Sequence, residues 1–155
     1  MEQARVDTTG RWIAANTREV WAALIDPAAR RHWLPPEDAT ATIDGWDFTL
    51  AGGYRMAVTH AGDGRSPGGT DIVDATFTRL AANAYLEETI RFVTDDPAFA
   101  GPMRLQWRLH PAGQGTLVEA IALDVPDAID RHDHVAALAV TLHQLADAVE
   151  QHAAA

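Results

Sequence analysis

The sequence predicts an α+β domain in which one long terminal helix lies across a curved antiparallel sheet of seven strands. The stretch 39–123 reads almost entirely as β-strand, and the stretch 127–152 contains no glycine and no proline. In the second stretch, apolar side chains recur at steps of three and four, which places them on one helical face. They are Val135, Leu138, Leu142, Leu145 and Val149. A stripe of this length needs a long apolar surface, and only the strands can supply one.

This architecture also predicts an internal cavity. A straight helix laid across a curved sheet does not fill the concavity completely, so space should remain between the helix and the strands. The sequence therefore points more strongly to a protein that binds a small molecule in a cavity than to an enzyme.

Composition sets limits on the domain and its partners. The 155 residues are 47% hydrophobic and fit one domain spanning 1–155, which can bury about 70% of its unfolded surface. The net charge of −10, with no basic run, excludes nucleic acid and anionic membranes as expected partners. The absence of cysteine excludes disulfides, thiol nucleophiles and thiolate metal sites. No long apolar run marks a secretion signal or membrane span, so we expect a cytoplasmic protein.

The first strand is predicted over 3–15, and two short helices follow it. Asn16 and Glu19 form a capping-box pattern at the start of the first helix. Asp26-Pro27 ends that helix and opens a second one through Leu34. Pro35-Pro36 then stops the second helix.

Six further strands are separated by glycine, proline and asparagine turn signals. The predicted strands cover 39–48, 53–59, 70–79, 85–93, 102–110 and 116–123. On the last strand both faces are apolar, so Val118 and its neighbours or the row Leu117, Ile121 and Leu123 could face inward. An outward Leu/Ile row would suit a homodimer contact, and it would equally suit an ordinary exposed apolar row.

Several short motifs stand in a family-like order between about residues 11 and 150. They are Val20-Trp21-Ala22-Ala23-Leu24 with Asp26-Pro27, Trp33-Leu34-Pro35-Pro36, Gly52-Gly53-Tyr54-Arg55-Met56, Phe92, the run from Asp95 to Gly101, Met103, Trp107, Gly115-Thr116, and Asp133-His134 running into Leu138, Leu142 and Leu145. In this order and spacing the chain resembles the START-related (SRPBCC, START/Bet v 1-like) helix-grip superfamily. Within it, the chain is similar to the AHSA1-like branch, named for the activator of Hsp90 ATPase.

The resemblance implies a cavity-forming domain whose members mostly bind or transform small hydrophobic molecules, while some act as chaperone co-factors. The closing helix departs from the family pattern, because Ala137-Leu138 stands where Gly-Trp is usual. This change removes a large aromatic side chain from the expected cavity wall.

We expect aromatic, thioether and leucine side chains to line the cavity, because small-molecule sites are mostly apolar. The predicted wall residues are Trp33, Trp46, Phe48, Tyr54, Met56, Phe77, Phe92, Met103, Trp107, Leu138 and Leu142. The same residues would also serve as an ordinary core.

Two polar residues are candidates for ligand contacts. Glu88 shares a strand face with Ile90 and Phe92, so its carboxylate could anchor a ligand or act as a general base if that face lines the cavity. A bulge or an edge position would instead leave Glu88 in solvent. His134, four residues before Leu138, could contact a ligand at one end of the cavity or hold the sheet–helix junction through a backbone partner.

The sequence supports no metal or nucleophile. In the run 130–134 the two histidines are two residues apart, and such positions diverge on a helix. We therefore expect no metal, no cofactor and no catalytic triad.

Three functions remain in view. The leading hypothesis is binding of a small hydrophobic or amphipathic ligand between the last helix and the sheet. A cyclase or dehydratase using Glu88 is the second, and a co-chaperone-like interaction module is the third.

Overall fold

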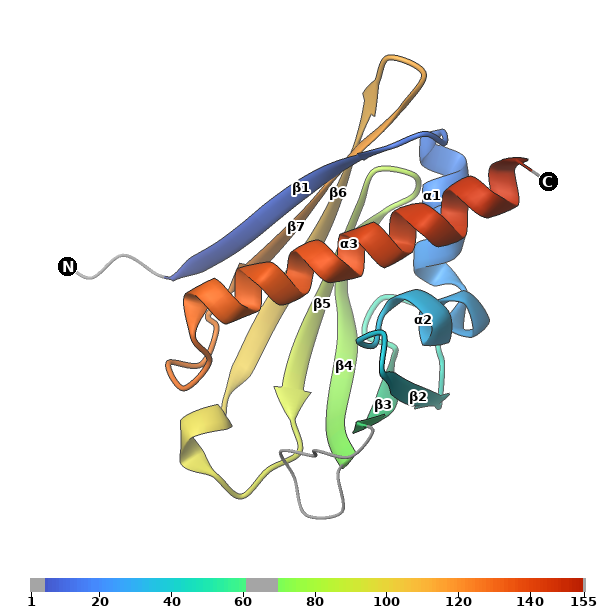
Figure 1. Ribbon diagram of the computed structural model, residues 1–155. Helices are drawn as coiled ribbons and strands as arrows, with labels where there is room; N and C mark the ends of the chain where they lie inside the picture. Colours follow the sequence, from blue (N-terminus) through green and yellow to red (C-terminus); the bar gives the residue numbers. More distant parts are fainter. Residues whose placement is uncertain (1–4, 61–69, 155) are drawn as a thin grey trace.

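A computed structural model describes residues 5–60 and 70–154 of the chain (Figure 1). Its strands and helices follow the predicted order, with a short 3-10 turn, Pro97–Phe99, between the fifth and sixth strands. The elements are β1 Val6–Ile13, α1 Thr17–Ile25, α2 Pro27–Trp33, β2 Ala39–Asp44, β3 Gly53–His60, β4 Thr70–Ala81, β5 Tyr85–Phe92, β6 Pro102–Ala112, β7 Gly115–Leu123 and α3 Arg131–Ala154.

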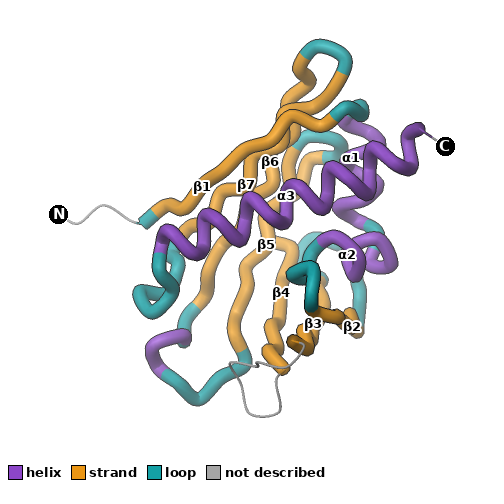
Figure 2. The backbone as a smooth tube through the Cα atoms, in the orientation of Figure 1, coloured by secondary structure: helices purple, strands orange, loops and turns teal. Residues whose placement is uncertain are grey.

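The strands form one antiparallel sheet in the order β1-β7-β6-β5-β4-β3-β2 across the described residues. The sheet curls, and α3 crosses its concave side while α1 and α2 cover the same side at one end (Figures 1 and 2). The predicted fold class, with seven strands, two short helices after the first strand and a long last helix across the sheet, is confirmed.

The predicted caps of the two short helices are confirmed. The Asn16 side chain accepts a hydrogen bond from the amide of Glu19 (2.9 Å), and the Glu19 carboxylate accepts one from the amide of Asn16 (3.4 Å). Asp26 accepts from the amide of Ala28 (2.9 Å), which caps α2. Satisfying these otherwise free amides fixes where each helix begins.

Several predicted boundaries were wrong, and two of the differences have a local reason. The strand predicted over 39–48 ends at Asp44, because Gly45 takes a left-handed conformation (φ 66°) that interrupts the extended backbone. The last helix begins at Arg131 and not at 127, since the Asp130 carboxylate accepts from the amide of Asp133 (3.0 Å) and caps it there. The first strand ends at Ile13, and its predicted start at residue 3 lies outside the described residues.

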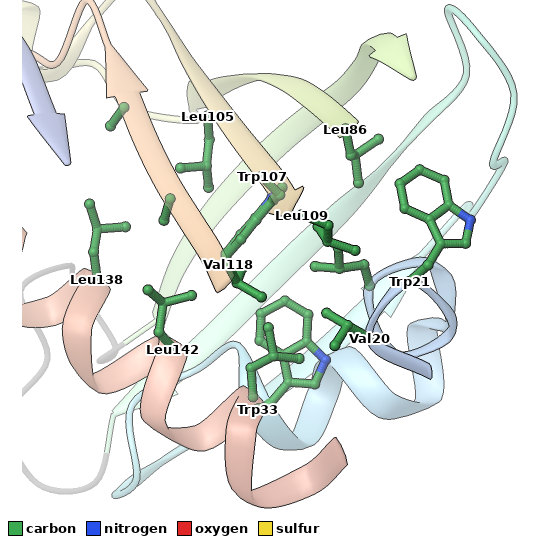
Figure 3. Close-up of a cluster of buried hydrophobic side chains, with 14 of the residues drawn as sticks. Val20, Trp21, Trp33, Leu86, Leu105, Trp107, Leu109, Val118, Leu138 and Leu142 are labelled. Carbon is green, nitrogen blue, oxygen red and sulfur yellow. The ribbon is translucent and has the colours of Figure 1, made fainter. Parts of the chain in front are cut away.

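The core lies between α3, the two short helices and the middle of the sheet (Figure 3). Trp33 of α2 packs edge to face on Trp107 of β6, with ring centroids 5.5 Å apart. On β7 the small inward set is Val118, Ala120 and Ala122, all fully buried. Fully or nearly fully buried side chains of α3 complete the cluster, namely Leu138, Leu142, Leu145, Ala146 and Val149.

The other face of β7 carries the Leu/Ile row. Leu117 is 37% exposed, and its cross-strand neighbour Trp12 on β1 is 50% exposed. The Trp12 indole nitrogen donates to the carbonyl of Ala112 (2.9 Å), which lays the ring over the β6–β7 turn. A homodimer through this row stays a prediction.

Among the helices in the described part of the chain, none combines the length and the apolarity needed to cross a bilayer.

Candidate functional site

A pocket of about 200 Å³ lies between the α2–β2 connection and the sheet. We call it the side pocket, and its lining residues are Leu34, Pro35, Pro36, Tyr54, Met56, Val58, Val73, Glu88, Ile90, Phe92, Met103 and Leu105. They come from the segment just after α2 and from β3, β4, β5 and β6. Ten of the twelve carry apolar side chains, and only Tyr54 and Glu88 carry polar ones.

The side pocket lies beside α3 and not beneath it. The sequence predicted a cavity between the last helix and the sheet, yet no α3 residue lines this pocket. Leu138 and Leu142, predicted as walls, are buried in the same hydrophobic cluster as Trp33 and Trp107. The side pocket therefore lies toward β3–β6, where the segment after α2 faces the sheet.

The predicted site residues fall into four groups. Those in the side pocket are Tyr54, Met56, Glu88, Phe92 and Met103. Trp33, Trp107, Leu138 and Leu142 lie in the core, while Trp46, Phe48 and Phe77 form an aromatic cluster beside Tyr54. His134 lies away from both, at the start of α3. Val58, Val73, Ile90 and Leu105 also line the side pocket but were not among the predicted wall residues.

Glu88 lies at the polar end of the side pocket, with its side chain 1% exposed. Its Oε1 accepts from Arg30 Nη1 (2.8 Å) and from the Tyr54 hydroxyl (2.6 Å). Its Oε2 accepts from Arg30 Nη2 (3.0 Å) and from the Trp107 indole nitrogen (2.7 Å). Glu88 faces inward, as its role as a ligand anchor or general base required, and is not in solvent. Neither interpretation predicted that its carboxylate would already be fully paired within the protein.

Arg30 is the residue that sequence reasoning missed. It lies in α2 three positions before Trp33, so both share a helical face, and its side chain is fully buried. Its guanidinium lies over the rings of Trp46 (5.4 Å), Tyr54 (5.4 Å) and Trp33 (5.7 Å). The available signal was indirect, since a buried carboxylate on an inward strand face requires a cationic partner.

The protonation states of Glu88 and Tyr54, which bond to each other and to Arg30, are fixed at neutral pH. Burial raises the pKa of Glu88, but the charge and hydrogen bonds of Arg30, with the donors Tyr54 and Trp107, outweigh it and hold that pKa below its usual value. Burial, and next the Glu88 charge, raise the pKa of Tyr54 well above its usual value. At neutral pH the cluster therefore contains an anion, a cation and a neutral phenol, and Glu88 is a poor proton acceptor.

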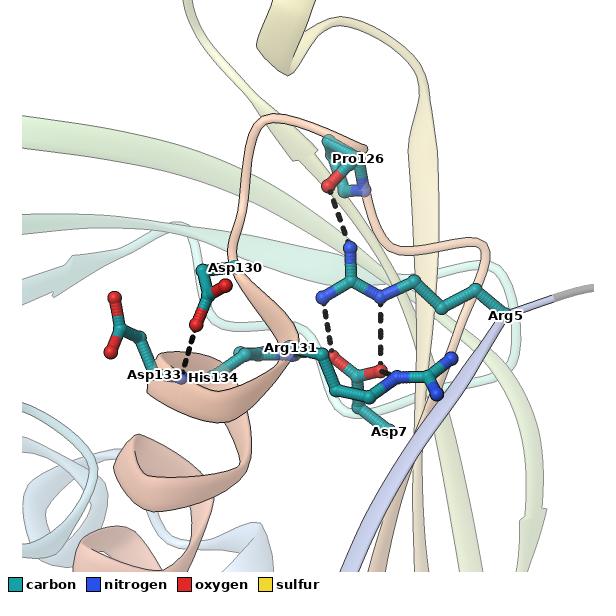
Figure 4. A network of polar contacts seen from close by, with 7 residues as sticks. All are labelled: Arg5, Asp7, Pro126, Asp130, Arg131, Asp133 and His134. Atoms are coloured by element: carbon teal, nitrogen blue, oxygen red, sulfur yellow. Dashed lines mark hydrogen bonds and ion pairs between the residues drawn. The ribbon is translucent and has the colours of Figure 1, made fainter.

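A second polar cluster joins the first strand to the last helix (Figure 4). We call it the terminal clasp. The fully buried Asp7 carboxylate accepts from Arg5 (3.0 and 2.8 Å) and Arg131 (3.3 Å), and it lies 2.8 Å from His134 Nδ1. His134 thus holds the sheet–helix junction, as one of the two sequence interpretations proposed, but through a side chain and not a backbone group.

A larger open depression of about 490 Å³ lies at the β2–β3 connection, with Asp44, Asp47 and Asp74 in its lining. Asp74 is paired with Arg55 (2.7 and 2.8 Å), and both side chains are about half exposed. Within 5–60 and 70–154, no group of three His, Cys, Asp or Glu side chains could hold a metal ion. The side pocket is less open than this depression and mostly apolar, so it is the better candidate site.

Comparison with known proteins bears on the whole chain. A crystal structure of a Chromobacterium violaceum protein is 26% identical and superposes with a TM-score of 0.84, over 94% of this chain and 96% of that one. The solution structure of the AHSA1-like protein from Aeromonas hydrophila is 18% identical, with a TM-score of 0.74 over 96% and 94% of the two chains. A Staphylococcus epidermidis protein is 16% identical, with a TM-score of 0.78 over 97% and 93%. The Aeromonas hydrophila and Staphylococcus epidermidis structures have less than 20% sequence identity to this chain, so they establish only its fold.

No curated protein matches the chain in sequence. The family model described as "Activator of Hsp90 ATPase homolog 1-like protein" matches residues 14–150, which is most of the chain. The resemblance inferred from the sequence motifs is therefore confirmed, and the chain belongs to the family of activator of Hsp90 ATPase homolog 1-like proteins.

Proposed function

We propose that this chain binds a small, mostly apolar molecule in the side pocket. The observation that carries the proposal is the composition of the lining: ten apolar side chains and one polar pair, Tyr54 and Glu88, around a partly open volume of about 200 Å³. Ligand sites commonly combine a concave apolar wall with a few placed polar groups.

The volume limits the size of the ligand. Pockets for drug-sized molecules measure about 300–1,000 Å³, so this one suits a smaller molecule. An apolar cavity of about 150 Å³ in another protein binds benzene. A compound of one ring is therefore the right size for a first probe.

Binding is better supported than acid–base catalysis. Glu88 is the carboxylate in the pocket lining, and four donors keep it ionised and occupied. A general base needs a lone pair that can reach the substrate proton. A co-chaperone-like role, which the family description suggests, would use an outer surface, so a pocket-filling variant separates the two.

The test is a titration of the chain with toluene. NMR chemical shifts of the methyl groups of Val73, Ile90 and Leu105 are measured at each step. We expect saturable shifts at these methyls in the parent chain. Val58→Phe fills the pocket and should weaken toluene binding by at least about tenfold, while the matched change Val140→Phe, at an exposed α3 position, should not alter it. The proposal is wrong if no saturable shifts occur, or if Val58→Phe binds toluene as well as the parent chain.

A further inference from the structure

The polar end of the side pocket has almost no hydrogen-bonding capacity left. A carboxylate offers about four lone-pair sites. All four on Glu88 are occupied, two by Arg30 and one each by Tyr54 and Trp107. Glu88 therefore cannot accept a hydrogen bond from a ligand without releasing one of these donors.

Tyr54 retains a single free position. Its hydroxyl hydrogen is donated to Glu88 (2.6 Å), and its oxygen accepts from Arg30 Nη1 (2.9 Å). A phenolic oxygen has two lone pairs and one hydrogen. One lone pair of Tyr54 is therefore unused, whereas its hydrogen is already donated. Tyr54 can thus accept one hydrogen bond from a ligand and donate none.

Arg30 is not accessible to a ligand either. It does not line the pocket, and its guanidinium is covered by three aromatic rings. Its Nε donates to the carbonyl of Leu24 (2.6 Å), which fixes the side chain in the wall. The positive charge is matched by Glu88 and does not attract an anion into the pocket.

The backbone of the lining adds no donor. Pro35 and Pro36 have no N–H, and Leu34 donates its N–H to the carbonyl of Arg30 (2.9 Å). The remaining lining residues lie in β3–β6, where N–H groups point along the sheet toward neighbouring strands and not out of its face.

We infer that the ligand of the side pocket is electrically neutral and accepts no hydrogen bond from the described lining residues, while the Tyr54 oxygen is the one side-chain acceptor open to it. This inference rests on the proposed function and narrows it, because it excludes carboxylates and other anions as well as ammonium ions. An anion would find no free donor among the described lining residues. An ammonium group would find one open side-chain acceptor, the neutral Tyr54 oxygen, and no unpaired anion for its charge.

The test compares four probes of similar size on the unmodified chain: toluene, benzyl alcohol, benzylammonium and benzoate at pH 7. Toluene and benzyl alcohol should bind within about tenfold of each other, since one hydrogen bond makes only a modest net contribution. Benzoate and benzylammonium should bind at least about 100-fold more weakly, because each would bury an unpaired charge.

The outcomes separate this inference from the proposed function. If none of the four probes binds, the proposed function itself is contradicted. If benzoate or benzylammonium binds within about tenfold of benzyl alcohol, the pocket stands and the neutral-ligand inference is overturned.

Glu88→Ala provides an independent check. Removing the carboxylate leaves Arg30 with unpaired donors and opens a space beside it, so benzoate should now bind at least about tenfold more tightly than benzyl alcohol. The inference is also overturned if Glu88→Ala keeps the selectivity of the parent chain. Should the variant fail to fold even with benzoate present, the four-probe comparison on the unmodified chain decides alone.

Discussion

At the residue scale, the central feature is a buried ion pair that belongs to both the fold and the pocket. Arg30 and Glu88 are almost completely inaccessible, and every side-chain nitrogen or oxygen buried in the described residues has a partner. A pair of this kind is costly to bury, and removing one member is more costly than keeping both, because the other charge then lacks compensation.

Glu88→Gln should therefore lower the free energy of unfolding by about 3–5 kcal/mol, as expected for breaking a buried pair. The matched change Glu119→Gln, on the partly exposed outer face, should change it by less than about 0.5 kcal/mol. Urea denaturation measures both values. Similar small losses for the two variants would show that Arg30 and Glu88 do not form the buried pair described above.

Asp7 gives the terminal clasp a pH dependence. Burial raises the pKa of Asp7, but hydrogen bonds from Arg5 and His134 outweigh it and hold the pKa below its ordinary value of 3.8. A depressed pKa in the folded state contributes stability that is complete above the unfolded value and is lost as pH falls through the folded one. The difference in unfolding free energy between the parent chain and Asp7→Asn should thus be constant above about pH 5 and shrink below pH 4. Denaturant titrations across this range measure it, and a difference that does not shrink would contradict the clasp.

At the element scale, α3 is fixed to β1 at both ends. The terminal clasp holds its first turn, and near its other end the Glu150 carboxylate accepts from the amide of Ala14 (2.8 Å), just after β1. Between these points Gln144 donates to the carbonyls of Trp33 and Pro35 (both 2.8 Å). The last helix therefore also fixes the segment that forms one wall of the side pocket.

The β3–β4 pair is another element whose geometry depends on one residue. A methyl group on Gly53 would overlap the carbonyl oxygen of Ala75 on β4, whereas a methyl group on Gly10 of β1 would make an ordinary contact, 3.5 Å from the carbonyl oxygen of Val118. Gly53→Ala should therefore destabilise the chain by about 1–3 kcal/mol and Gly10→Ala by much less. Thermal or urea unfolding of the two variants checks this. Equal effects would mean that β3 and β4 do not approach so closely.

How far the sequence predicts each element depends on whether its cause is local. The capping box at Asn16 and the apolar stripe of α3 are local patterns, and both are confirmed. The length of β2 was overestimated because alternation continues past Gly45, while the chain turns there. The choice of inward face on β7 required knowing that small side chains lie under α3.

At the scale of the whole molecule, the order of motifs predicted the fold correctly, but it did not distinguish the lining of the side pocket from the core. Large side chains such as Trp33 and Trp107 could equally line a void or fill it, and only their packing against each other decides that. Arg30 and Glu88 are separated by 58 positions in the chain, so their pairing follows from how α2 lies on the sheet. No local pattern encodes such a contact.

The proposed function requires the side pocket to be an apolar space that a ligand can enter. A crystal structure of the chain under xenon pressure tests it directly, because xenon enters apolar cavities of this size. We expect xenon density between Val58, Ile90 and Leu105, with the Arg30–Glu88 pair unchanged. Side chains that close this space, with no xenon between them, would contradict the account.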